Sequence, residues 1–261
     1  MPRLWIPVGL LLLFALALGA GPALMAQLPP SLLGGAGGHA RGLPYADVRP
    51  WLGVPNAADT LSNLPFALLG LAVIHRLRRP LAASAEARLA LAVLALGLLA
   101  TALGSGHYHL RPTAERLVVD RMGMAVLFAG VLGLALAERG PRSAVLPVLL
   151  SLTPLGLLAA ALPLWGHLLP WGLMQYGGVL SLLVLAWRSL QPEALGVRCG
   201  WVLIGYALAK LCESLDAPIY ELTAGVVSGH TLKHLFAAAA LGPVLWALHR
   251  PRLDQSAAIP A

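Results

Sequence analysis

Five polar residues lie at the ends of otherwise apolar segments, and their types suit metal-assisted hydrolysis. His230 and His234 are four residues apart, so on a helix both imidazoles leave the same face. Ser105 and His109 have the same spacing, and Asp120 follows eleven residues after His109. Three histidines with an open fourth position are the ligand set of a catalytic zinc ion, and a nearby carboxylate can orient a ligand or accept a proton. The pattern predicts a zinc site of His109, His230 and His234 beside Ser105 and Asp120.

Two other interpretations of these histidines stay open on spacing alone. A histidine inside a membrane helix can simply form a hydrogen bond to a neighbouring helix. Alternatively, His109 or His107 could face His230 or His234 across a bundle and ligate a haem iron from both sides. The haem interpretation gives no role to Ser105 or Asp120. The zinc hypothesis therefore explains more of the pattern.

The chain that must position these residues has the composition of an integral membrane protein. Of its 261 residues, 58% are hydrophobic and only 11% are charged, and the mean hydropathy is +0.78. A soluble domain carries about 25% charged residues. Continuous apolar runs indicate helices, whereas the strands of a membrane barrel alternate. The net charge of +7 is spread over short loops, which does not indicate nucleic-acid binding. We therefore predict an all-α, polytopic membrane helical bundle.

The apolar runs predict a seven-span core preceded by an N-terminal hydrophobic segment. The predicted spans are 4–26, 58–76, 87–110, 115–137, 143–161, 164–187, 198–215 and 229–248. The first could be a signal peptide or a retained span. A signal-peptide cleavage site would need a small residue at the position of Leu24, so we favour a retained span. The predicted organisation is a hydrophobic segment at 1–27, an outer loop at 28–57, a seven-helix hydrolase domain at 58–250 and a cytoplasmic tail at 251–261.

The basic residues of the loops predict the orientation of the chain. Four regions rich in arginine all fall on one side if every span crosses once, and Glu213, Asp216 and Glu221 fall on the other. The arginines are Arg76, Arg78, Arg79, Arg88, Arg139, Arg142, Arg188, Arg198, Arg250 and Arg252. Because basic loops stay in the cytoplasm, we predict a cytoplasmic C-terminus, a histidine cluster toward the outer face and a location in the plasma (inner) membrane.

The remaining polar residues have predicted structural roles. Ser228 is expected to cap the last span. Lys210, Glu213 and Asp216 form a cluster at the end of the predicted span 198–215. A structural ion pair is expected there, and Lys233 is expected to reach one of the carboxylates. The two cysteines, Cys199 and Cys212, are expected to pack as small apolar residues without forming a disulfide or binding metal.

Taken together, the motifs resemble those of the alkaline ceramidase family. The shared pattern is S-x-x-x-H at Ser105 and His109, Asp120 eleven residues later, and H-x-x-x-H at His230 and His234. The stretch DTLSNLPFALLG at 59–70 resembles the polar start of the family's first core helix. The resemblance runs from about Tyr45 to Arg250 and extends to a wider superfamily of seven-span hydrolases, which also contains the adiponectin and progestin receptors.

This resemblance implies a zinc amidohydrolase that cleaves the amide bond of ceramide or a related N-acyl lipid. His109, His230 and His234 would bind Zn²⁺, while Ser105 and Asp120 would hold the attacking water and assist the chemistry. A receptor-like relative that keeps the metal with little turnover is the alternative. Eukaryotic ceramidases carry a calcium-binding acidic cluster before the first core helix, but Asn56 stands in place of its glutamate, so we do not predict calcium. The expected partner is a lipid amide substrate.

Overall fold

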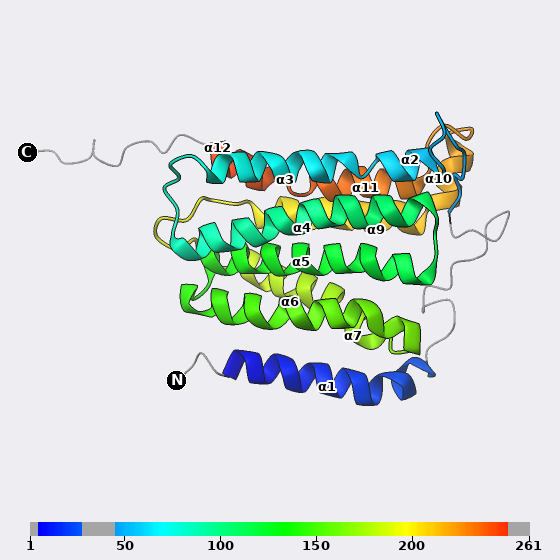
Figure 1. Cartoon of the computed structure of the whole chain (residues 1–261). Coiled ribbons are helices and arrows are strands. Elements are labelled where there is room, and N and C mark those ends of the chain that lie inside the picture. Colours follow the sequence, from blue (N-terminus) through cyan, green and yellow to red (C-terminus); the bar gives the residue numbers. More distant parts are fainter. Residues whose placement is uncertain (1–4, 28–44, 250–261) are drawn as a thin grey trace, which may run out of the picture.

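The described part of the chain is built from helices packed side by side, which confirms the predicted all-α bundle. A computed structural model describes residues 5–27 and 45–249, and within these ranges it contains no β-strand. The long helices run roughly parallel or antiparallel to one another, so that the connections collect at the two ends of the bundle (Figure 1). The connecting loops therefore lie at the two ends of the bundle, and its middle consists of helices.

Seven helical stretches in the described residues are long and apolar enough to cross a membrane. Three of them are single helices: α1 (Trp5–Met25), α4 (Ala85–Leu110) and α5 (Ala114–Arg139). The second consists of α2 (Ala57–Leu61) and α3 (Leu64–Leu77). Further along, α6 (Val145–Ala161) has a 3₁₀ turn at each end, Arg142–Ala144 and Leu162–Trp165, and α7 (Leu169–Gly172) joins α8 (Gly178–Ala186) through a π turn, Leu173–Gly177. The last is α11 (Gly229–Ala239) followed by α12 (Gly242–His249). The chain is a multi-pass membrane protein.

The predicted span at 198–215 is a shorter helix than the others. It appears as α9 (Cys199–Ser214), whose 16 residues reach about 24 Å at 1.5 Å per residue, less than the roughly 30 Å of a hydrocarbon core. The chain continues into α10 (Asp216–Leu222) at the same end of the bundle. Because α9 lies within the bundle, beside α8 and α11, it still carries the chain from one end to the other (Figure 1).

One predicted boundary is wrong. The span predicted at 164–187 was expected to begin at 164, but the helix begins with α7 at Leu169. Residues Leu162–Trp165 instead extend the preceding span as a 3₁₀ turn, and Gly166 ends it with a φ of 82°, which is a left-handed conformation that glycine adopts without strain. The turn therefore lies at 166–168.

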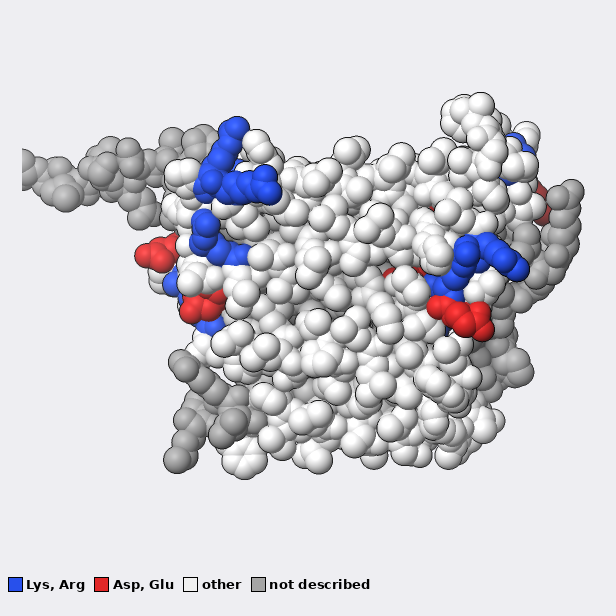
Figure 2. All heavy atoms as spheres, in the orientation of Figure 1, with Lys and Arg blue, Asp and Glu red and all other residues white. Residues whose placement is uncertain are grey.

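The outer surface of the bundle has the character of a lipid-facing protein. Large apolar side chains such as Leu68, Leu103 and Leu150 are 67%, 76% and 68% exposed, which a water-soluble surface would not show over so many positions. On the face drawn in Figure 2, charged side chains gather near the two ends and leave a broad uncharged belt between them. This belt is what a hydrocarbon environment requires.

The centre of the bundle is the pair α4 and α5. Leu91, Leu94 and Leu98 of α4 are fully buried. At Gly104, an added Cβ would lie 2.7 Å from the carbonyl oxygen of Val119 on α5, so only glycine allows the two helices to approach this closely. This contact sets the separation of the helices at the end where the candidate site lies.

Some predictions concern residues outside the described part of the chain. The loop predicted at 28–57 is described only from residue 45, and the tail predicted at 251–261 lies wholly outside the described residues. The helix α1 agrees with a hydrophobic segment at 1–27 and packs on α6 and α7.

Candidate metal centre

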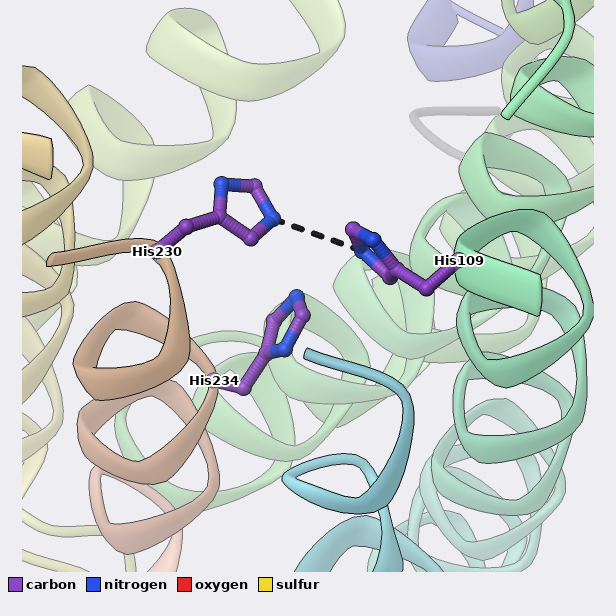
Figure 3. Close-up of side chains that lie close together, drawn as sticks. All are labelled: His109, His230 and His234. Carbon is purple, nitrogen blue, oxygen red and sulfur yellow. Dashed lines mark hydrogen bonds between the residues drawn. The ribbon is translucent and has the colours of Figure 1, made fainter. Parts of the chain in front are cut away.

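The three predicted zinc ligands meet at one end of the bundle. His109 comes from α4, and His230 and His234 come from α11. One ligand atom from each lies within 4.8 Å of those of the other two, and all three residues are buried. Figure 3 shows the three imidazoles turned toward one another, with Nε2 of His109 and Nε2 of His230 3.3 Å apart. The structure therefore brings together residues that are up to 125 positions apart in the chain.

The start of α11 is held in place by caps and by a close helix contact. Ser228 accepts a hydrogen bond from the backbone N–H of Thr231 at 3.0 Å, which confirms its predicted role as the N-cap. Asp216 accepts from the backbone N–H of His230 at 2.8 Å. At Gly229 an added Cβ would lie 2.2 Å from the carbonyl oxygen of Cys212, so no larger residue fits there. These contacts fix the first turn of α11, from which both histidines project.

One pair of nitrogens in the cluster has the spacing of two ligands on a single metal ion. With zinc–nitrogen bonds of about 2.0–2.1 Å, two ligand nitrogens in a tetrahedral site lie about 3.3–3.4 Å apart, close to the 3.3 Å between His109 and His230. The nitrogen that His109 directs at His230 is Nε2; its Nδ1, on the other side of the ring, has no partner among the described residues. Neutral imidazoles that direct nitrogens at a common point are stabilised when a cation occupies that point. The three histidines could hold a metal ion.

The same geometry argues against the haem interpretation. Axial ligands of a haem must lie on opposite sides of a macrocycle. The ring centroids of His109 and His230 are 4.9 Å apart, as are those of His109 and His234. This spacing leaves no room for a macrocycle between them. His107 is exposed and stands apart from the cluster.

A hydrogen-bond chain reaches His234 from the start of the second span. Nδ1 of His234 lies 2.8 Å from the hydroxyl oxygen of Ser62, which is itself 3.0 Å from the carbonyl oxygen of Asp59. If Nε2 of His234 binds a metal, Nδ1 keeps its hydrogen and donates it to Ser62, while the serine donates to the carbonyl. Every hydrogen in this tautomer has an acceptor. Such partners of metal-bound histidines orient the ring and strengthen binding.

Asp59 is buried and belongs to the same group of polar residues. Its Oδ1 accepts a 2.7 Å hydrogen bond from the hydroxyl of Thr231 on α11. The side-chain amide of Asn63 donates to the backbone carbonyl of Asp59 at 2.8 Å. The polar start of the second span is therefore tied to α11 at the level of the histidines.

Ser105 and Asp120 lie together where α4 and α5 meet. Both residues are buried, at 3% and 7% exposure, and both line one cavity, where the serine side chain lies near the aspartate carboxylate. The close approach at Gly104, next to Ser105, is what allows this pairing. Both side chains line the same cavity as His234, so the predicted general base and its partner are on the side from which a substrate could reach the histidines.

That cavity runs from the histidine cluster into the apolar middle of the bundle. The cavity is open on one side, and with that open space included its volume is about 900 Å³. At one end it is lined by polar residues, including Asn63, Ser105, Asp120 and His234. The rest of its wall is mostly apolar and comes from α3, α5, α8, α9 and α11. Those residues are Phe66, Leu127, Phe128, Val131, Leu132, Leu182, Val202, Leu203, Ala237 and Leu241. A cavity of this shape suits a molecule with one polar end and one long apolar chain.

A short strap that precedes the second span covers the histidines from the other side. The ring of Tyr45 packs on His109 and His230, with centroid distances of 4.8 and 4.3 Å. The next residue, Ala46, donates its backbone N–H to Asp216 at 2.9 Å. Asp216 therefore holds both the strap and the first turn of α11 through its two carboxylate oxygens.

The strap, residues 45–49, is further fixed by an ion pair. Arg49 contacts Asp47 at 2.8 Å and also donates to the carbonyl of Val226 at 3.2 Å. Burial on its own would raise the pKa of Asp47, but the hydrogen bonds and positive charge of Arg49 outweigh it and hold that pKa below its ordinary value. Burial raises the pKa of the Tyr45 phenol, so this side chain stays neutral.

The predicted charged cluster is confirmed in part. Glu213 pairs with Lys210 through Oε2 and with Lys233 through Oε1, the latter at 2.7 Å. Asp216 does not join this ion pair, because both of its oxygens are occupied by backbone N–H groups. Both cysteines are free and buried, as expected.

Sequence reasoning missed several residues that surround the histidines. Ser62, Tyr45 and Asp216 were not assigned to the site, and Asn56 was considered only as a departure from a calcium site. The structure shows that the Asn56 amide donates to the backbone carbonyl of His109 at 2.7 Å. The available signal was the run of polar residues, DTLSN, at the start of an otherwise apolar span.

Comparison of the chain with protein-family models, with curated proteins and with solved structures finds no match to any of them.

Proposed function

We propose that the protein is a zinc-dependent membrane hydrolase that cleaves the amide bond of ceramide or a related N-acyl lipid. The observation that carries this proposal is the meeting of three buried histidines with Ser105 and Asp120 at the polar end of an apolar cavity. The resemblance to the alkaline ceramidase family supports the same reaction. His109, His230 and His234 would hold the ion.

When bound, zinc supplies a Lewis acid that polarises a carbonyl and lowers the pKa of water to about 7. The residues of the chain then have distinct tasks. Asp120 accepts a proton from the water that attacks the amide carbon, and it returns the proton to the nitrogen as the C–N bond breaks. The products are a fatty acid and an amine, and the atoms of one water are divided between them.

Ser105 stabilises the negative charge that develops on the amide oxygen. Its side chain lines the cavity near Asp120. Once Asp120 has accepted the proton of the water, the single hydroxyl hydrogen of the serine is free to donate to the amide oxygen. A hydrogen-bond donor at such a position contributes about 2.7–4 kcal/mol to the stability of the transition state. The apolar wall formed by α5, α8 and α9 would receive the acyl chain.

The proposal includes a membrane orientation. The connections α3–α4, α5–α6 and α8–α9 gather at the end of the bundle opposite the histidine cluster (Figure 1). They carry or adjoin Arg76, Arg78, Arg79, Arg88, Arg139, Arg142, Arg188 and Arg198, whereas the described connections at the histidine end carry only Arg49 and Arg111. The positive-inside bias favours a cytoplasmic location for that end. The histidine cluster would then lie toward the outer face of the inner membrane, within reach of lipid.

The test combines metal analysis with lipid hydrolysis on protein purified in detergent. Wild type should contain about one zinc per chain, and His234→Ala should lose most of it, since three imidazoles are needed to hold the ion. Asp120→Asn should keep zinc, because the imidazoles hold it, yet release fatty acid from N-acyl sphingoid lipids about 10²–10⁴-fold more slowly. Full zinc with no hydrolysis of any lipid amide in the wild type would support a receptor-like protein instead.

A further inference from the structure

Lys233 places a positive charge in the wall of the cavity next to a proposed zinc ligand. It immediately precedes His234 on α11, and both residues line the cavity together with Asp120 and Ser105. Its side chain is only 19% exposed. A buried cation within the membrane is costly, and such residues usually serve a binding or transport function. The proposed hydrolysis of a neutral lipid assigns no task to this lysine.

The charges around Lys233 do not balance within its own cluster. Glu213 is shared by Lys210 and Lys233, one ammonium on each carboxylate oxygen. Two cations and one anion leave a formal charge of +1. A structural ion pair would need only one of the two lysines. Asp120 lines the same cavity and its charge acts on Lys233, but the two side chains form no direct ion pair in the described structure. An ammonium group has three donors, so Lys233 can bind a further anion.

The shape of the cavity determines which part of a substrate lies near this charge. The acyl chain must occupy the apolar wall, because the polar residues gather at the histidine end. With the amide at the histidines, the group attached to its nitrogen stays at the same polar end. Lys233 and His234 are adjacent on α11, where successive side chains diverge by about 100°. Both residues nevertheless line the same cavity, so Lys233 borders the space that the amine side of the substrate would occupy.

Other polar atoms that line the cavity also lack partners. Thr101 Oγ1, Asn63 Oδ1 and the hydroxyl of Tyr206 are buried without a hydrogen-bond partner in the described structure. Buried groups of this kind are rare in folded proteins unless something else satisfies them. A ligand with a polar head of several hydrogen-bonding atoms would do so.

We propose that the site takes N-acyl lipids whose amine portion carries an anionic group, a carboxylate or a phosphate, and that Lys233 binds this group. The inference rests on the proposed function and narrows its substrate class. An anionic head would accept a hydrogen bond from the ammonium group of Lys233, which Glu213 contacts through one carboxylate oxygen. It would also anchor the amide at the histidines while the acyl chain fills the apolar part of the cavity.

The test measures binding, so that it does not depend on turnover. N-oleoylglycine, N-oleoylethanolamine and the phosphate ester of N-oleoylethanolamine share one acyl chain and differ in the head. Each competes with a neutral fluorescent lipid for purified protein in one detergent. Wild type should bind the two anionic lipids about 10- to 100-fold more tightly than the neutral one, as expected for a hydrogen bond to a charged group. The stronger of the two anions identifies the head.

Substitutions isolate the contribution of the lysine. Lys233→Met keeps the length of the side chain and should bind all three lipids equally, with unchanged affinity for the neutral one. Lys233→Arg should keep the preference. Lys210→Met is the matched control, because it removes the other cation from Glu213 and leaves Lys233 in the cavity, so the preference should persist. Zinc content is measured on every sample.

The outcomes separate this inference from the proposed function. Equal binding of anionic and neutral lipids by wild type would overturn the inference, even if lipid amides are hydrolysed. A preference for anionic lipids that survives in a folded Lys233→Met would also overturn it. A preference that Lys233→Met removes, in a protein that hydrolyses no amide, would support the anion site and contradict the hydrolase. If Lys233→Met does not fold, the wild-type comparison and Lys233→Arg still decide the question.

Discussion

Replacing Ser62 by alanine should weaken zinc binding although Ser62 is not a ligand. In the wild type the serine hydroxyl lies 2.8 Å from Nδ1 of His234. Removing it leaves a buried N–H without its best acceptor, at a cost of about 1–3 kcal/mol. The side-chain amide nitrogen of Asn63 is also near, 3.5 Å from the same nitrogen. An amide N–H is a donor, so it cannot accept the hydrogen of the histidine. The penalty corresponds to roughly 10- to 100-fold in affinity, which matches the usual effect of removing such partners.

The assay is competition for zinc between the purified protein and a chromophoric chelator, in one detergent and at pH 7. Ser181→Ala is a matched control, because Ser181 on α8 also donates to a backbone carbonyl, at 2.8 Å, but lies far from the histidines in the chain and is exposed to the lipid side. Its zinc affinity should equal that of wild type. His234→Ala sets the lower limit. If Ser62→Ala keeps wild-type affinity while His234→Ala loses zinc, then the hydrogen bond does not set the orientation of the ring, and our account of the tautomer is wrong.

Three further predictions address packing, pH and topology. Gly104→Ala should lower the melting temperature and slow hydrolysis, because its Cβ would lie 2.7 Å from the Val119 carbonyl oxygen and overpacking costs about 1–3 kcal/mol; Gly106→Ala, which has open space, should do neither. Because the pKa of Asp47 is lowered from 3.8, its stabilising contribution is complete at higher pH and is lost only as pH falls below that value. The difference in melting temperature between wild type and Asp47→Asn should therefore stay constant from about pH 5 to 7 and shrink below about pH 4; loss of the difference near pH 6 would contradict this. A cysteine at Pro112 in a cysteine-free background should react with an impermeant reagent from outside intact cells, and reaction only after lysis would reverse the proposed orientation.

The helical secondary structure and the depth of the histidines along the bundle axis could be predicted from the sequence. Apolar runs of about 20 residues have one stable form in a membrane, the helix, because hydrocarbon offers no partner for free backbone groups. The i, i+4 spacing of His230 and His234 determines that both leave one face of α11. The end of one span and the start of the next lie at the same level, which places His109 at the depth of the other two. These inferences need only local geometry, and the structure agrees with them.

The neighbours of the histidines were decided only by the tertiary structure. Ser62 and His234 are 172 positions apart, and nothing in their helical periodicity indicates that α2, α4 and α11 meet laterally around one point. The same holds for Tyr45, whose strap has no regular periodicity, and for Lys233, whose position in the cavity depends on the packing of α9 against α11. Periodicity along one chain determines the face and depth of a side chain. The side-by-side order of helices depends on which surfaces fit, such as the close approach of α4 and α5 at Gly104.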